Sequence, residues 1–184
     1  GDVDGDGDLD LAAGNSDRNR LYRNDGGQLT TSAVWSANAW FLTEAVAWGD
    51  YDGDGDLDLA AGNSGVNRLY RNDGGTLTAT AVWTSTEADH TWSIAWGDVD
   101  DDGDLDLVAG NSGPNRLYRN DDGTLTASGV WTSTISAGTH SVAWGDYDGD
   151  GDLDLAAGNS GGGATDQLYR NDGGVLTLDM SWDN

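Results

Sequence analysis

The chain has 184 residues, and 33 acidic side chains against 8 basic ones give it a formal net charge of -25 at pH 7. The basic residues stand singly, so no basic patch can neutralise phosphates, which excludes nucleic acid as a partner. No apolar run approaches the ~18 residues that span a bilayer, which excludes membrane insertion. Because the sequence has no Cys, it has no disulfide, thiolate metal site or Cys nucleophile.

Glycine punctuates the sequence, with 29 residues against a single Pro, which indicates a repetitive chain rich in loops. The chain starts at Gly1 with neither Met nor a hydrophobic leader, so we expect a mature piece or a fragment of a longer protein.

An acidic run that begins Gly-Asp recurs every 48 residues, at Gly1, Gly49, Gly97 and Gly145. We therefore expect a single repeat array over residues 1–184, with repeats at approximately 1–43, 44–91, 92–139 and 140–184. Three extra residues around Gly161 to Ala164 of the fourth copy mark a loop.

Each repeat divides into four segments of strand length. In the second copy the expected strands are 45–48, 57–61, 68–71 and 77–83, and Asn72-Asp73-Gly74-Gly75 between the last two is a hairpin turn signal. No window shows sustained helical spacing of apolar residues, so we expect an all-β chain. Four antiparallel strands in a unit of this length predict a β-propeller blade. The first repeat begins after the position of its inner strand, so its blade should lack that strand.

Tryptophan recurs in step with the repeat and is expected to pack between blades. The aligned residues are Trp35, Trp83, Trp131 and Trp182, and Trp48, Trp96 and Trp144.

An acidic loop joins the first two strands of each repeat. In the second copy it runs from Asp50 to Asp58 as D-x-D-x-D-G-x-x-D, with carboxylates at loop positions 1, 3, 5 and 9. Alternate carboxylates converge on one point, the Gly allows a sharp turn, and a main-chain carbonyl at position 7 adds a ligand, which favours Ca²⁺. Zn²⁺ would need His or Cys nearby, and Mg²⁺ seldom occupies such a carboxylate cage.

Two other interpretations of this loop have to be weighed against a Ca²⁺ site. An EF-hand needs a Glu at position 12, where all four copies have Ala, and needs flanking helices, so the loop is not an EF-hand. A solvated loop without metal would leave repulsion of ~1 kcal/mol for each carboxylate pair at 4 Å even in water.

The unit AWGDYDGDGDLDLAAGNSGVNRLYRNDGG resembles the FG-GAP and VCBS repeats of integrin-α-like β-propellers, and the resemblance covers nearly the whole chain. It implies one Ca²⁺ in each of these loops, about four per chain, in a secreted or cell-surface protein concerned with adhesion, glycan binding or enzyme attachment. The implied side-chain ligands are Asp2, Asp4, Asp6 and Asp10; Asp50, Asp52, Asp54 and Asp58; Asp98, Asp100, Asp102 and Asp106; and Asp146, Asp148, Asp150 and Asp154. The implied carbonyl ligands are those of Asp8, Asp56, Asp104 and Asp152.

The number of repeats in this chain differs from the number of blades in that family, whose rings generally close with about seven blades. The chain holds about 3.8 repeat units by length, which leaves three explanations: a fragment of a longer propeller, half of an eight-bladed dimer, or a small four-bladed ring with an incomplete blade. Exposed edges would favour a homo-oligomer.

The crossovers between repeats are the most variable part of the chain, at 36–44, 84–92 and 132–140, and should lie on the face opposite the acidic loops. Exposed aromatic residues there are suited to a glycan or a protein partner, although drift of unselected loops explains the variation equally well. The candidate ligand-binding residues are Trp40, Phe41, His90, Trp92 and His140. The sequence shows no nucleophile with a base, so we expect no enzyme but a calcium-binding recognition or adhesion module. The alternatives are a self-assembling propeller scaffold, or a lectin-like or enzyme-attached glycan-binding domain.

Overall fold

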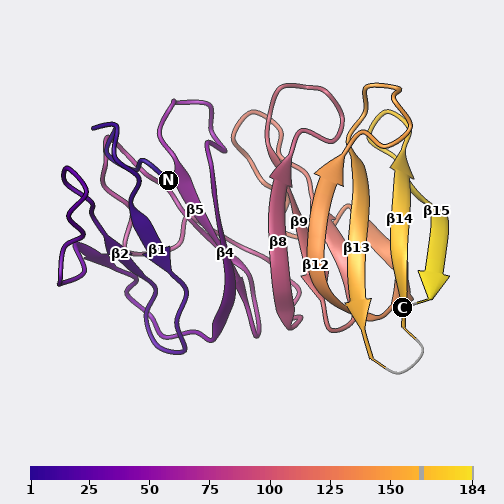
Figure 1. Ribbon diagram of the computed structural model, residues 1–184, viewed down its shortest axis with the longest axis horizontal. Helices are drawn as coiled ribbons and strands as arrows, with labels where there is room; N and C mark the ends of the chain where they lie inside the picture. The colour runs from indigo at the N-terminus through magenta and orange to yellow at the C-terminus, as the bar shows by residue number, and fades with distance from the viewer. Residues whose placement is uncertain (162–163, 184) are drawn as a thin grey trace.

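A computed structural model describes residues 1–161 and 164–183 of the chain. These residues form antiparallel sheets and loops, with no helix among them, which confirms the all-β prediction. Four sheets follow one another along the chain and stand side by side in Figure 1. We call them blades 1 to 4. Within the described part of the chain there is no helix long and apolar enough to cross a membrane.

Three of the blades have four strands and the first has three, which confirms that blade 1 lacks its inner strand. Blade 1 contains β1 (Leu11–Ala13), β2 (Arg20–Tyr22) and β3 (Trp35–Ser36). Blade 2 contains β4 (Thr43–Gly49), β5 (Asp58–Asn63), β6 (Arg68–Tyr70) and β7 (Trp83–Thr84). Blade 3 contains β8 (Thr91–Gly97), β9 (Asp106–Asn111), β10 (Pro114–Tyr118) and β11 (Trp131–Ser136). Blade 4 contains β12 (Gly138–Gly145), β13 (Asp154–Ser160), β14 (Thr165–Asn171) and β15 (Leu176–Asp183).

The outer strand of blade 2 is shorter than expected. A strand over 77–83 was predicted, but β7 is Trp83–Thr84, and Leu77 forms only an isolated bridge with Asn72. Residues 79–81 leave the ladder between two bonds, from Thr78 N to Arg71 O and from Val82 N to Leu69 O. The carbonyl of Ala79, freed from the ladder, accepts a 2.8 Å hydrogen bond from the amide of Asn38 in blade 1. At this bulge, a hydrogen bond between two blades therefore replaces a hydrogen bond between two strands of one blade.

Neighbouring blades share apolar cores. Leu69 of blade 2 packs with Leu107 and Tyr118 of blade 3, and all three are almost fully buried. Equivalent clusters lie between blades 1 and 2 and between blades 3 and 4. Burial of a Leu side chain contributes ~1.5–3 kcal/mol, so stacking is the main stabilisation that each sheet receives.

The aligned tryptophans pack between blades as expected, with one exception. Three of them meet a tyrosine of the next blade edge-on, at ring-centroid distances of 5.0–5.2 Å; the pairs are Trp35–Tyr70, Trp83–Tyr118 and Trp131–Tyr169. The prediction for Trp182 was wrong, because its side chain is exposed on β15. This strand stays in its ladder with a single register shift, so Met180 takes the place opposite Leu168 that tryptophan takes in the other blades.

The inner-strand tryptophans lie against a glycine of the preceding blade. A Cβ at Gly97 would lie 2.7 Å from Cδ1 of Trp144, and the same contact joins Gly49 to Trp96. Gly145 is the equivalent residue of blade 4, and a Cβ there would have nothing within 4 Å. These glycines are thus required by the close approach of the next blade.

Gly97→Val is therefore expected to destabilise the protein by about 1–3 kcal/mol through overpacking against the indole of Trp144. Urea unfolding followed by tryptophan fluorescence measures the change. Gly145→Val is the matched control and should change stability by less than about 0.5 kcal/mol. Equal losses in the two variants would contradict the blade packing.

Candidate metal centre

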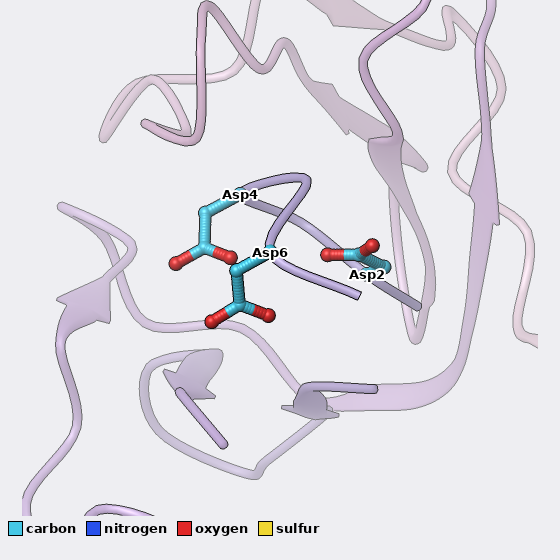
Figure 2. Close-up of side chains that lie close together, drawn as sticks. All are labelled: Asp2, Asp4 and Asp6. Atoms are coloured by element: carbon cyan, nitrogen blue, oxygen red, sulfur yellow. The ribbon is translucent and has the colours of Figure 1, made fainter. Parts of the chain in front are cut away.

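The four acidic loops occupy equivalent places, at residues 2–10, 50–58, 98–106 and 146–154, and each leads into the second strand position of its blade. In every loop three carboxylates approach so that one oxygen from each lies within 4.8 Å of the others. Figure 2 shows this for Asp2, Asp4 and Asp6 of the first loop. In the other loops the three belong to positions 1, 3 and 9: Asp50, Asp52 and Asp58; Asp98, Asp100 and Asp106; Asp146, Asp148 and Asp154.

The carboxylates at positions 1 and 9 are oriented by backbone amides. In the second loop, Asp50 accepts hydrogen bonds from the amides of Asp54 and Gly55, at 3.1 and 3.0 Å. Asp58 is buried and accepts from the amides of Tyr51 and Asn72, at 3.0 and 2.7 Å. Its partner Asn72 follows the third strand, so this carboxylate connects the acidic loop to the far turn of its own blade.

Position 3 is different, because its carboxylate has a buried oxygen without a partner. Oδ1 of Asp4, of Asp52 and of Asp100 is buried and makes no hydrogen bond. Burial raises the pKa of Asp52 and of Asp100, and Arg119, whose guanidinium lies 2.6 Å from Asp100, opposes the rise there. A buried carboxylate oxygen without a donor is costly unless a cation is bound. These oxygens therefore suit a metal.

The next blade covers position 3 in loops 1 to 3. A Cβ at Gly75 would lie 2.9 Å from Cβ of Asp4, so only glycine allows this approach. The carboxamide of Asn72 in the same turn donates to the carbonyl of Val3 at 2.8 Å. Gly123 and Gly174 make the equivalent approach to loops 2 and 3. Blade packing and loop geometry are thus coupled.

Positions 5 and 7 have roles that the sequence does not reveal. The carboxylate of Asp54 accepts from the amide of Asp56 at 2.9 Å, which closes the loop on itself. The carboxylate of Asp56 in turn accepts from the amide of Gly74 at 2.6 Å, and thereby ties the acidic loop to the hairpin turn. Asp6, Asp102 and Asp150 at position 5, and Asp8, Asp104 and Asp152 at position 7, do the same in their loops. The recurrence of this turn, as N-D-G-G in three copies and N-D-D-G in the third, was the signal that could have indicated this pairing: it begins 14 residues beyond the last Asp of the first three loops and 17 residues beyond that of the fourth.

Two of the buried position-9 carboxyls, those of Asp58 and Asp106, make the metal-free protein sensitive to pH. Burial raises the pKa of Asp58 and of Asp106 to about 6, because the charged form loses its hydration. Both pKa values exceed that of an unfolded Asp. The stability these groups contribute is therefore complete below pH ~4 and is lost as the pH rises through about 6.

In EDTA, the free energy of unfolding should therefore fall between pH 4.5 and pH 7, by roughly 2 kcal/mol for each of the two carboxyls. With saturating Ca²⁺ the trend should reverse, because the ion replaces the protons. Urea unfolding at both pH values, with and without EDTA, tests this. A metal-free protein that gains stability toward pH 7 would contradict the assignment.

One loop carries local backbone strain. Asp101 has a φ of 57°, whereas the other loops have glycine at this position, such as Gly53 with a φ of 70°. Because glycine adopts this conformation without steric cost, Asp101→Gly should stabilise the protein by about 0.5 kcal/mol and leave metal binding unchanged. Gly53→Asp is the reciprocal variant, and thermal unfolding should show a loss of similar size. A destabilised Asp101→Gly protein would refute this interpretation.

The donor set fits a hard cation of Ca²⁺ type. Each cluster offers only carboxylate oxygens, with no His or Cys among its members. The orphaned buried oxygen of Asp52 lies beside the oriented carboxylates of Asp50 and Asp58. Bound Ca²⁺ would offset the repulsion between these charges and complete the ligation of that oxygen.

On the opposite face, the structure brings together only part of the predicted ligand residues. Trp92 and His140 stack with ring centroids 4.1 Å apart, and the centroid of the His90 ring lies 5.2 Å from that of Trp92. Nε2 of His90 lies 3.4 Å from Oε1 of Glu44, so the row spans three blades. Glu44 was missed as a member of this row, although it aligns with Trp92 and His140 in the repeat.

Phe41 and Trp40 are not in that row. The guanidinium of Arg68 lies 3.2 Å from the centroid of the Phe41 ring, and the two residues line a shallow pocket with Tyr70. Trp40 is 71% exposed. The crossovers lie beside the loops between the second and third strands, since the amide of Gly65 bonds to the carbonyl of Asp89 at 2.9 Å. This confirms that both kinds of loop share one face.

Sequence comparison identifies the repeats. The profile for the FG-GAP-like repeat matches residues 2–61, 50–109 and 98–157, and that for the FG-GAP repeat matches 138–178. These repeated, blade-forming units with acidic loops define the class, and the chain belongs to the FG-GAP-like repeat family. A search of curated protein sequences found no match.

Two solved structures share the fold. One is an Agrocybe aegerita lectin whose title describes specific recognition of non-reducing terminal N-acetylglucosamine, with 22% identity and a TM-score of 0.65 over 98% of this chain and 50% of that one. The other is BBS1N, solved in complex with ARL6DN and soaked with lead, with 14% identity and a TM-score of 0.63 over 96% of this chain and 53% of that one. The chain thus spans about half the length of these structures.

Proposed function

We propose that this chain is a calcium-binding β-propeller module that serves recognition or adhesion in a secreted or cell-surface protein. One structural Ca²⁺ in each acidic loop holds the loop against its neighbours. The observation that carries the proposal is the unpaired, buried Oδ1 at position 3, which lies among oriented carboxylates in three of the four loops. Membership of the FG-GAP-like repeat family supports it.

A structural role for the ion follows from the coupling between loop and blade. Asp58 connects the second loop to the backbone of Asn72 in the same blade, and Asn72 donates to Val3 in blade 1. An ion among Asp50, Asp52 and Asp58 would therefore fix both the hairpin turn and the blade interface. Four near-identical loops argue against a single catalytic metal, so we propose no enzyme activity.

Calorimetric titration with Ca²⁺ tests the proposal. The wild-type protein should bind about four ions, and Asp52→Asn should bind one fewer, because loop 2 loses a carboxylate. Asp73→Asn is the matched control, since Asp73 is an exposed hairpin residue paired with Arg71 at 2.8 Å and belongs to no cluster. Unchanged stoichiometry in Asp52→Asn, or no heat in the wild type, would reject the proposal.

Glycan recognition is the second candidate, supported by the row that contains His90, Trp92 and His140. These aromatic rings have polar edges and lie on the face opposite the acidic loops, where they are suited to stacking on a sugar. The matched lectin recognises N-acetylglucosamine, which makes this sugar the first probe to use. Binding should be lost in Trp92→Ala and kept in Trp182→Ala, whose exposed Trp lies on the outer strand β15; retention in both, or no binding, would reject this candidate.

A further inference from the structure

A pocket of about 160 Å³ opens at the interior interface between blades 1 and 2. It is lined by Ala39 and Phe41 of the crossover between these blades and by Arg68, Tyr70 and Ala81 of blade 2, among others. It shares no residue with the acidic loops or with the row of stacked rings. A cavity of similar size in another protein holds one benzene molecule, so this pocket has room for a small organic ligand.

The equivalent place between blades 2 and 3 is filled by a carboxylate of the protein itself. Oε1 of Glu87 accepts a hydrogen bond from the amide of Gly129 at 3.2 Å, and its Oε2 accepts from the hydroxyl of Tyr118 at 3.4 Å. Arg116 lies beside this carboxylate and donates to Asp89 at 2.6 Å. Although burial lowers it, the pKa of Arg116 is raised by the charges of Asp89 and Glu87. An amide, a phenol hydroxyl and a guanidinium therefore surround the carboxylate of Glu87.

The interface between blades 1 and 2 has the same donors but not the acceptor. The equivalent residues, one 48-residue period earlier, are Tyr70 for Tyr118, Ala81 for Gly129, Arg68 for Arg116 and Ala39 for Glu87. Neither the hydroxyl of Tyr70 nor the amide of Ala81 donates a hydrogen bond to any residue that the structure describes, although Tyr70 is only 1% exposed. Donors in a buried place are costly when nothing accepts from them. The pocket therefore lacks the group that Glu87 supplies at the next interface.

The third interior interface supplies an acceptor to its tyrosine in another way. The hydroxyl of Tyr169 donates to Oε1 of Gln167 at 2.6 Å. Gln167 stands where blade 2 has Arg68, so this interface has no cation at that place. Among the tyrosines at the three interior interfaces, Tyr70 alone has no acceptor within the described residues.

The guanidinium of Arg68 has no carboxylate partner either. Phe41 stands where the next repeat has Asp89, and the guanidinium lies over its ring and donates to the carbonyl of Val66 at 2.9 Å. Arg68 forms no ion pair with any described residue, in a chain whose net charge is -25. Burial lowers the pKa of Arg68, because the charged form loses hydration. An anion in the pocket would offset this loss.

We propose that this pocket binds a small monocarboxylic acid, whose carboxylate takes the place that Glu87 takes between blades 2 and 3. The carboxylate accepts hydrogen bonds from the hydroxyl of Tyr70 and the amide of Ala81, and Arg68 provides the counter-charge. Ala39 lacks the CH₂COO⁻ group of a glutamate, so an acid of two or three carbons has the matching length. A free acid is favoured over an acidic segment of another protein, because the net charge of the chain repels a highly charged partner more than a single carboxylate.

Saturation-transfer NMR of propionate with the full chain, in a buffer that contains Ca²⁺, tests the proposal. We expect transfer from the protein to the propionate methyl group, and binding about tenfold weaker or more in Tyr70→Phe, which loses one hydrogen bond to a charged group. Ala39→Glu should abolish the transfer, because the new side chain places its own carboxylate in the pocket. Val175→Glu is the matched control, since Val175 is 59% exposed in blade 4 and the variant adds the same charge away from the pocket.

1-Propanol at the same concentration is the neutral counterpart of propionate and should show no comparable transfer. Equal transfer to the alcohol, transfer to propionate that is unchanged in Tyr70→Phe, or no transfer to propionate at all would overturn the proposal. Tyr70→Phe keeps the aromatic ring that packs on Trp35, with centroids 5.2 Å apart, so this variant decides the question even where Ala39→Glu does not fold. Because the pocket holds no residue of the acidic loops, the result is independent of the Ca²⁺ proposal.

Discussion

Removal of Ca²⁺ is expected to lower the stability of this protein more than any single substitution. At a Ca²⁺ concentration 100 times the dissociation constant, one site stabilises the folded state by about 2.7 kcal/mol, so four sites contribute roughly 10 kcal/mol. This is of the order of the whole stability of a domain. Thermal unfolding followed by the fluorescence of the 9 Trp should therefore show a large loss in EDTA.

The physical cause is the electrostatic state of the loops. Without the ion, loop 2 holds Asp50, Asp52 and Asp58 with oxygens within 4.8 Å of one another, and an unpaired oxygen is left buried. Mg²⁺ at equal concentration is the control, because it screens charge equally but prefers to keep its waters. Equal protection by the two ions, or a melt that EDTA leaves unchanged, would count against specific sites.

The second large effect is expected for Tyr118→Ala. Tyr118 is 1% exposed and meets Trp83 of the preceding blade edge-on, with centroids 5.1 Å apart. Removal of a buried aromatic ring leaves a cavity between the blades and should cost about 3–5 kcal/mol. Urea unfolding measures the difference in free energy.

Tyr22→Ala provides the control for this prediction. Tyr22 has the equivalent position in blade 1 but no preceding blade, and it is only half-buried. Its removal should cost less than half as much as that of Tyr118. Equal costs would show that contacts within a blade, and not between blades, stabilise these rings.

The blade repeat and the acidic loops were predictable because their signals recur with a fixed period. One copy of D-x-D-x-D-G-x-x-D between two apolar runs is a weak indication, but four copies in register exclude chance. The same register placed Trp48 and Trp83 at blade interfaces. Local residue patterns were therefore sufficient to predict the blades and the acidic loops, because these recur in the same order in each repeat.

What the sequence did not reveal depends on contacts between segments. The bulge at 79–81 arises because the carbonyl of Ala79 bonds to Asn38 in another blade, and strand propensity does not record such a partner. Trp182 was misplaced because the other outer-strand tryptophans pack on a tyrosine of the following blade and the chain has no blade after blade 4, so Met180, which pairs opposite Leu168, is exposed as well. Asp56 was predicted to act only through its main-chain carbonyl, as a metal ligand. The role of its carboxylate in anchoring the hairpin turn was missed, since the partner Gly74 is distant in sequence.

The most direct test of this account is a native mass spectrum of the chain in a volatile buffer that contains Ca²⁺, compared with one recorded after EDTA. We expect about four Ca²⁺ for each 19.2 kDa chain, removed by EDTA and reduced by one in Asp52→Asn. A spectrum of the folded, metal-free mass in the presence of Ca²⁺ would contradict it.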